Sequence, residues 1–171
     1  MLEIKVIKTQ NYSEIQLQKI SNAVKKMEKV LNSKVFKYQV LAFEIQGKIG
    51  FSYKKNWFSS FEKYTNYHVY HFIMNPKEGI AEEETNSIEL FLSLDSGDVG
   101  KTKEKSLPVE QWIHTDLMFF ESATESELAG HFAHEWCHKL GFYHSRYKWQ
   151  DLNRDYSVPY AIGNLVETLS S

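Results

Sequence analysis

Residues 124–144 read TESELAGHFAHEWCHKLGFYH, and the fold is best predicted outward from this stretch. Thr124 and Glu127 stand three residues apart in the pattern of a capping box, in which a helix begins just after the threonine. Gly141 is the residue type that commonly ends a helix, because glycine adopts a positive φ without strain. The stretch therefore predicts one long helix over residues 124–140.

The two sides of this predicted helix differ in chemistry. At 100° per residue, His138 lies about 40° and Glu135 about 100° around the axis from His134, so these three residues share one side. We expect the other side to pack against a sheet, with Cys137 as a small buried apolar residue and not a nucleophile. That apolar side consists of Ala129, Phe132, Ala133, Trp136, Cys137 and Leu140.

The polar side has the spacing of a metal site. His134 and His138, four residues apart, can direct their imidazole nitrogens at one ion, and zinc needs a third protein ligand beside an open position. His144 can be that ligand, because Gly141 allows the chain to turn back sharply after the helix. Glu135 follows the first histidine and is placed to act as a base toward a water molecule at the metal.

Residues 134–144 resemble the H-E-x-x-H-x-x-G-x-x-H signature of the metzincin clan of zinc metallopeptidases. The resemblance implies that one catalytic Zn²⁺ is bound by His134, His138 and His144, and that Glu135 is the general base and acid. It also implies an α+β fold in which a twisted mixed β-sheet packs with an early helix, a long active-site helix and a short C-terminal helix. Residues 1–171 would then form a single catalytic domain.

The segment after the motif departs from the metzincin pattern. Metzincins have a methionine-containing turn beneath the metal, but this chain has no methionine after Met118. Val158, Pro159 and Tyr160 stand at the corresponding place, which indicates a divergent branch in which valine forms the apolar floor. Tyr160 is a candidate to ligate zinc or to stabilise the oxyanion, and the alternative is a tyrosine packed under the site.

Other residues compete for roles near the metal. Glu167 would be the third ligand in a gluzincin arrangement, and Asp151 and Asp155 are further replacements for His144. His131, one turn before His134, is expected to line the cleft or to support a ligand. The remaining histidines lie in strand-like segments and are expected to be structural: His68, His71 and His114.

The rest of the chain shows a mixture of strand and helix patterns. Ser13 and Gln16 form a second capping box before a 3.6-residue apolar period, so an amphipathic helix is predicted over residues 13–33. The tail after Pro159 indicates a short helix, and the glycine-marked residues 96–108 indicate a loop with at most a short edge strand. Strands are predicted at residues 2–8, 34–45, 68–74, 87–94 and 110–120.

Composition limits the classes of partner. The chain has 171 residues, a net charge of -2 and one cysteine, which fits one domain without an internal disulfide and without the basic field of a nucleic-acid binder. No apolar stretch of about 18 residues predicts a membrane span. The first ten residues lack the apolar segment of a secretory signal, so a cytoplasmic location is the default expectation, or secretion for a mature fragment. We expect a monomer, although the sequence does not determine the oligomeric state.

These features predict a zinc-dependent endopeptidase that acts on a peptide or protein substrate. The same site is also compatible with a zinc hydrolase of non-peptide amides, or with a zinc-binding interaction module that has lost catalysis. A peptide is expected to bind extended along a sheet edge, as in strand addition. Residues 97–105 and 110–118 are the two candidate edges.

Overall fold

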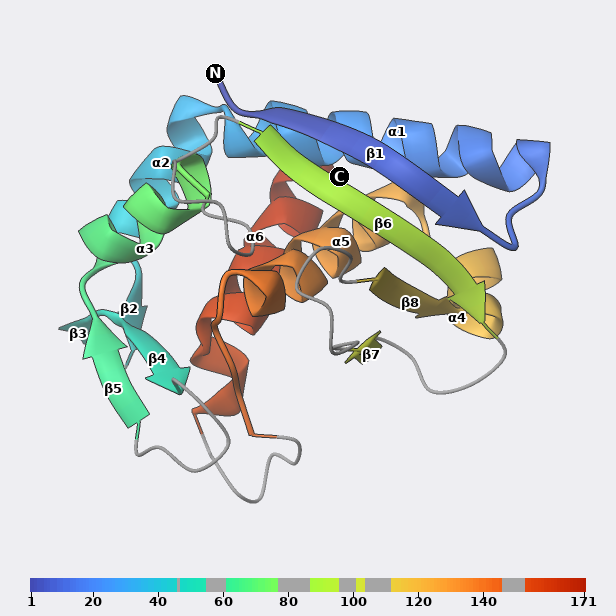
Figure 1. Cartoon of the computed structure of the whole chain (residues 1–171). Coiled ribbons are helices and arrows are strands. Elements are labelled where there is room, and N and C mark those ends of the chain that lie inside the picture. Colours follow the sequence, from blue (N-terminus) through green and yellow to red (C-terminus); the bar gives the residue numbers. More distant parts are fainter. Residues whose placement is uncertain (46, 55–60, 77–86, 96–100, 104–111, 146–152) are drawn as a thin grey trace.

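The computed structural model describes residues 1–45, 47–54, 61–76, 87–95, 101–103, 112–145 and 153–171. These residues form one four-stranded sheet, two small antiparallel hairpins and six α-helices (Figure 1). In chain order the elements are β1 (Glu3–Gln10), α1 (Glu14–Leu31), α2 (Lys34–Leu41), β2 (Glu44–Ile45), β3 (Lys48–Ile49), β4 (Phe51–Lys54), β5 (Phe61–Tyr64), α3 (Asn66–Met74), β6 (Ser87–Asp95), β7 (Lys101–Lys103), β8 (Trp112–Asp116), α4 (Leu117–Ser122), α5 (Glu125–Lys139), η2 (Arg154–Tyr156) and α6 (Val158–Ser170).

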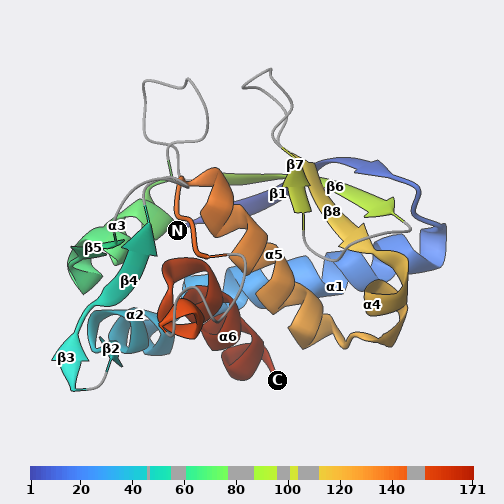
Figure 2. The ribbon, with the colours of Figure 1, turned by 90° about the horizontal axis from the view of Figure 1, so that it is seen from below.

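The sheet is mixed, with strand order β1-β6-β8-β7. Strands β1, β6 and β8 are parallel, and β7 runs antiparallel beside β8. Helices α1, α5 and α6 lie on one side of this sheet (Figure 2). Alternate residues of β6 belong to the core because successive side chains of a strand point to opposite faces: Ile88, Leu90, Leu92 and Leu94. Mixed helices and strands around this core are compatible with the α+β class.

Helix α1 confirms the predicted early amphipathic helix. Ser13 caps it, and the reciprocal bonds of a capping box with Gln16 are both present. The end of this helix and its C-cap also bond the start of β1: the Asn32 amide side chain bonds both backbone groups of Leu2, just before the strand, and Glu28 accepts from the backbone N–H of Ile4. These bonds occupy backbone groups that an edge strand otherwise exposes.

Two predicted strands are helices instead. The first, at residues 34–45, is helix α2 followed by the two-residue strand β2. Ser33 caps α2 by accepting a hydrogen bond from the backbone N–H of Phe36. Phe36 and Val40, four residues apart, are buried on one face, which is a helical and not a strand spacing.

The second, at residues 68–74, lies within helix α3. Thr65 caps this helix by accepting from the backbone N–H of His68, and Val69 and Ile73 are its fully buried residues. Both prediction errors have one cause. The aromatic and β-branched residues favour strands, but the threonine or serine cap and an i, i+4 buried pair favour a helix, and packing selected the helix.

The strand predicted at residues 110–120 is confirmed only for Trp112–Asp116, which form β8. Strand β8 ends at Asp116, whose carboxylate accepts from the backbone N–H groups of Met118 and Phe119 and so begins α4. Strand β7 is the short edge strand expected within residues 96–108. The C-terminal helix α6 has 13 residues and is longer than expected, with Pro159 in its first turn.

Helices α5 and α6 approach each other closely at a pair of glycines. A Cβ atom on Gly163 would lie 2.9 Å from the carbonyl oxygen of Gly130 and 3.1 Å from Cβ of His134. Only hydrogen at these positions allows the two backbones to touch, so this contact brings the second turn of α6 against α5 at Gly130. Among the described residues, no helix has the length and apolar character needed to cross a membrane.

Candidate metal centre

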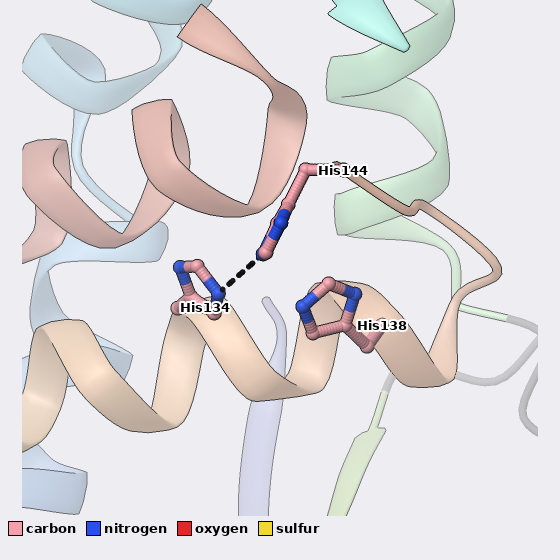
Figure 3. Close-up of side chains that lie close together, drawn as sticks. All are labelled: His134, His138 and His144. Atoms are coloured by element: carbon pink, nitrogen blue, oxygen red, sulfur yellow. Dashed lines mark hydrogen bonds between the residues drawn. The ribbon is translucent and has the colours of Figure 1, made fainter. Parts of the chain in front are cut away.

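Helix α5 confirms the predicted helix and its two sides. Thr124 and Glu127 form the capping box, and Phe132, Trp136 and Cys137 are fully buried. His134 and His138 project from the same face, and His144 reaches back toward them from the segment after the helix (Figure 3). One imidazole nitrogen from each of these three histidines lies within 4.8 Å of the other two.

The turn after α5 has the hydrogen bonds of a Schellman motif. The backbone N–H of Gly141 bonds the carbonyl of His138 at 3.0 Å, and that of Phe142 bonds the carbonyl of Cys137 at 3.1 Å. Gly141 has a φ of +89°, and a Cβ there would meet nothing within 4 Å, so the backbone conformation and not space requires glycine. The predicted sharp turn is confirmed, and it starts the return of the chain to His144.

Backbone carbonyls orient two of the three imidazoles. Nδ1 of His138 lies 2.7 Å from the carbonyl oxygen of Phe142, and Nδ1 of His144 lies 2.9 Å from that of Ser145. A carbonyl oxygen can only accept, so each Nδ1 carries the proton and each Nε2 presents its lone pair. Bonds of this kind select the tautomer that binds metal in known metal sites.

The spacing fits a metal ion. Nε2 of His144 and Nε2 of His134 are 3.2 Å apart, the contact drawn as a dashed line in Figure 3. Two Zn–N bonds of about 2.0–2.1 Å at a tetrahedral angle hold their nitrogens about 3.3 Å apart. Two lone pairs facing each other at this distance repel unless a cation or proton lies between them. The three residues therefore fit a metal ion, with zinc as one candidate.

The protonation states also suit a metal. Burial, with a smaller contribution from the nearby His144, lowers the pKa of His138 to about 4. Burial also holds the pKa of His134 well below its ordinary value, with smaller contributions from the other histidines and from Arg154. Metal binding requires the neutral imidazole, so these two side chains are in the ligand form at neutral pH.

Glu135 lies beside the histidines but inside the protein. It is 3% exposed, and its Oε1 is 3.9 Å from Nε2 of His134. A carboxylate at this distance from a ligand atom is close enough to reach a water molecule on the metal. The structure thus brings together Glu135 with all three expected ligands.

Tyr160 also reaches the site. Its ring centroid lies 4.5 Å from that of His134 and 4.6 Å from that of His144, so the ring stands against both imidazoles. The phenol oxygen accepts a hydrogen bond from Nη2 of Arg154. Val158, two residues earlier, is fully buried in the core. The first turn of α6 therefore supplies an aromatic wall to the histidine cluster.

The competing ligands do not join this cluster within the described residues. Glu167 is exposed and belongs to α6. It lies near Gly130 of α5, and Gly130 is one full turn before His134. Asp155 belongs to η2 and is not among the grouped ligand atoms. Asp151 lies outside the described residues. His144 is thus the third ligand that the structure brings to His134 and His138.

The other sequence candidates have separate surroundings. His131 does not join the cluster: its Nε2 lies 3.2 Å from Oγ1 of Thr115 on β8, and burial lowers its pKa to about 4. His114, on β8, bonds Asp95 on β6. His68 and His71 lie on α3 and not on a strand. Burial raises the pKa of the Cys137 thiol, which agrees with an apolar and unreactive role.

Two contributors were missed from the sequence. One is Arg154, although arginine occurs at only two positions of this lysine-rich chain, 146 and 154. The other is the glycine pair that brings α5 and α6 together. A glycine inside each of two helical patterns was the available signal, because such glycines often mark a close approach.

Comparisons with protein-family models, with curated proteins and with solved structures found no match to this chain. The functional interpretation therefore depends on the geometry of the histidine cluster and its neighbours.

Proposed function

We propose that this protein is a zinc-dependent metalloendopeptidase of the metzincin type. One observation carries the proposal: three histidine nitrogens lie within 4.8 Å of one another, and the Glu135 carboxylate is 3.9 Å from one of them. A metal site that is only structural needs no carboxylate base at that place, whereas a hydrolytic site does.

Zinc, when bound by the three histidines, would polarise the scissile carbonyl and lower the pKa of a water molecule toward 7. Glu135 takes a proton from that water as its oxygen forms a bond to the carbonyl carbon. The carbon–nitrogen bond then breaks, and Glu135 returns the proton to the leaving amine. The buried position of Glu135 supports this role, because a buried side chain has fewer rotamers available than an exposed one.

Tyr160 supplies a hydrogen-bond donor to the carbonyl oxygen as that oxygen gains negative charge. Its ring lies against His134 and His144, so its hydroxyl is carried by the same wall that holds the metal ligands. Donors placed where charge develops contribute more than donors that must first reorganise.

The peptide binds along β7. Strand β8 is paired over residues 112–114 with β6 on one side and β7 on the other, so residues 110–118 cannot be an open edge there. Strand β7 (Lys101–Lys103), the only described part of residues 97–105, ends the strand order and contacts α5 (Figure 2). An extended peptide added to β7 would run beside the helix that carries His134 and His138.

The order of the elements supports the metzincin assignment. An early helix, a mixed sheet, the histidine helix and a C-terminal helix follow one another as that clan arranges them. Val158 is a buried apolar residue at the place of the absent methionine.

Digestion of a fluorogenic peptide library, with and without a chelator, tests the proposal. Cleavage should stop with the chelator and return with added zinc. Glu135→Gln should keep stoichiometric zinc but lower kcat by about 10²–10⁴-fold, because the base is lost while the ligands remain. Glu125→Gln, an acid-to-amide change at the start of the same helix, is the matched control and should leave kcat unchanged.

The same experiment separates the alternatives. Hydrolysis of small acylated amines without peptide cleavage would indicate a hydrolase of non-peptide amides. Stoichiometric zinc with neither activity would indicate a binding module. Peptide cleavage that is equally fast with Glu135→Gln would exclude the mechanism given above.

A further inference from the structure

Arg154 contacts Tyr160, which stands against the histidine cluster. Its Nη2 donates to the Tyr160 hydroxyl, and its Cζ lies 4.5 Å from the centroid of the same ring. Arg154 begins η2, and the backbone N–H of Ser157 bonds its carbonyl at 3.0 Å, which ties η2 to the start of α6. The arginine and the tyrosine are therefore held together across one tight turn.

The charge of Arg154 has no acidic partner within the described part of the chain. Its Nε is buried and has no hydrogen-bond partner there. Guanidinium remains protonated at any ordinary pH, and taking part of it out of water costs folding free energy unless other groups compensate. Among the described side chains, the Tyr160 hydroxyl and ring are the groups that Arg154 contacts, so we look for its role at Tyr160.

We propose that Arg154 is a positioning residue that holds the Tyr160 phenol with its O–H directed at the substrate carbonyl oxygen beside His134 and His144. This inference rests on the proposed function of the site and names a residue of that reaction beyond the histidine motif.

The direction of the hydrogen bond carries the inference. Arginine has donors only, so Tyr160 must accept from Arg154, and its own proton stays available for another acceptor. The ring, standing against both imidazoles, limits where that proton can point. The permanent cation that donates to the phenol oxygen also polarises the hydroxyl, because hydrogen bonds in a chain strengthen one another. Arg154 thereby makes Tyr160 a better donor without touching the substrate.

A double-mutant cycle on peptide cleavage tests this coupling with Arg154→Met, Tyr160→Phe and the double variant. Arg154→Met should lower kcat about tenfold or more, with KM changed less than about threefold, since only the transition state gains the stronger donor. In the Tyr160→Phe background the same substitution should change kcat less than about threefold. Arg154→Lys should recover part of the lost kcat, because lysine keeps the charge and one donor.

Matched controls test whether the loss of a cation or of a hydroxyl at another position has the same effect as its loss at Arg154 or Tyr160. Lys25→Met removes an exposed cation on α1, and Tyr156→Phe removes the hydroxyl of an exposed tyrosine in the same turn as Arg154. Neither should change kcat by more than about twofold. If Lys25→Met lowered kcat as much as Arg154→Met, the change in net charge would explain the loss and the inference would be wrong.

A second measurement uses metal-free protein and requires no activity. In urea unfolding of the same four proteins, the two single substitutions should be non-additive by at least about threefold in the unfolding constant, as for residues in contact. Additive effects here, or a full Arg154→Met effect on kcat in the Tyr160→Phe background, would overturn the inference. A wild-type protein that cleaves nothing would instead overturn the proposed function, and non-additive unfolding would still support the Arg154–Tyr160 pairing.

Discussion

Helix α5 is held in two different ways by its two helical neighbours. Helix α1 reaches the first turns of α5 through polar side chains: Asn22 bonds Glu125 at 2.7 Å, and Lys26 bonds Ser126 at 3.1 Å. Lys26 also bonds the carbonyl of Ser170, at the end of α6, at 2.7 Å. Helix α6 instead meets the middle of α5 backbone to backbone, at Gly130 and Gly163.

The two contacts differ in how precisely they fix the position of α5. Long side chains adjust their rotamers, so the contact with α1 tolerates small shifts of one helix against the other. Two touching backbones have no such freedom, and the glycine contact is one helical turn from His134 on α5 and from Tyr160 on α6. The part of α5 that carries the histidines is thus the part whose neighbour is held most rigidly.

The largest expected effect is that of His144→Ala on zinc affinity, at the rigidly held part of α5. It removes one of three ligands, and even loss of a group that only supports a ligand lowers metal affinity about 10–100-fold. Zinc affinity should fall at least about 100-fold, or about 2.7 kcal/mol, measured by competition with a chromophoric chelator. His68→Ala, on the exposed surface of α3, is the control and should bind zinc as the wild type does. Equal affinities of His144→Ala and wild type would move the third ligand elsewhere.

Gly163→Ala should break the backbone contact. The added methyl group would lie 2.9 Å from a carbonyl oxygen and 3.1 Å from Cβ of His134, so α6 must move. We expect about 1–3 kcal/mol of lost unfolding free energy, from overpacking, together with lower activity as Tyr160 shifts. Urea denaturation measures the first and peptide cleavage the second. Asn164→Ala, exposed on the same helix, should be neutral or slightly stabilising. A Gly163→Ala protein as stable and active as wild type would contradict the rigid contact.

The smallest expected effect is that of Lys26→Met, which tests the side-chain contact of α1 with α5. It removes the bonds to Ser126 and to the carbonyl of Ser170, at a cost of about 1 kcal/mol in urea denaturation. Cleavage should remain unchanged, because α1 can adjust without moving the histidines. Lys25→Met, at the neighbouring exposed position, should change stability by less than about 0.5 kcal/mol. An activity loss in Lys26→Met as large as in Gly163→Ala would remove the distinction between the two contacts.

Sequence reasoning succeeded where signals are local and agree. Both capping boxes and the glycine turn after α5 depend on bonds between residues a few positions apart. It failed at α2 and α3, where strand-forming residues stood beside helix caps at Ser33 and Thr65. Such short segments have no strong preference of their own, so burial of one face against the core selects the conformation.

The candidate site divides in the same way. The sequence by itself determined His134, Glu135, His138 and His144, because a helix of 3.6 residues per turn and a positive-φ glycine place them by local geometry. Only the tertiary structure decided that Tyr160 stands against two of these histidines, that Arg154 bonds its hydroxyl, and that β7 rather than β8 ends the strand order among the described residues. Those facts depend on how closely two helices approach and on which strands pair. Spacing along the chain does not encode them, because they follow from packing between segments that are distant in sequence.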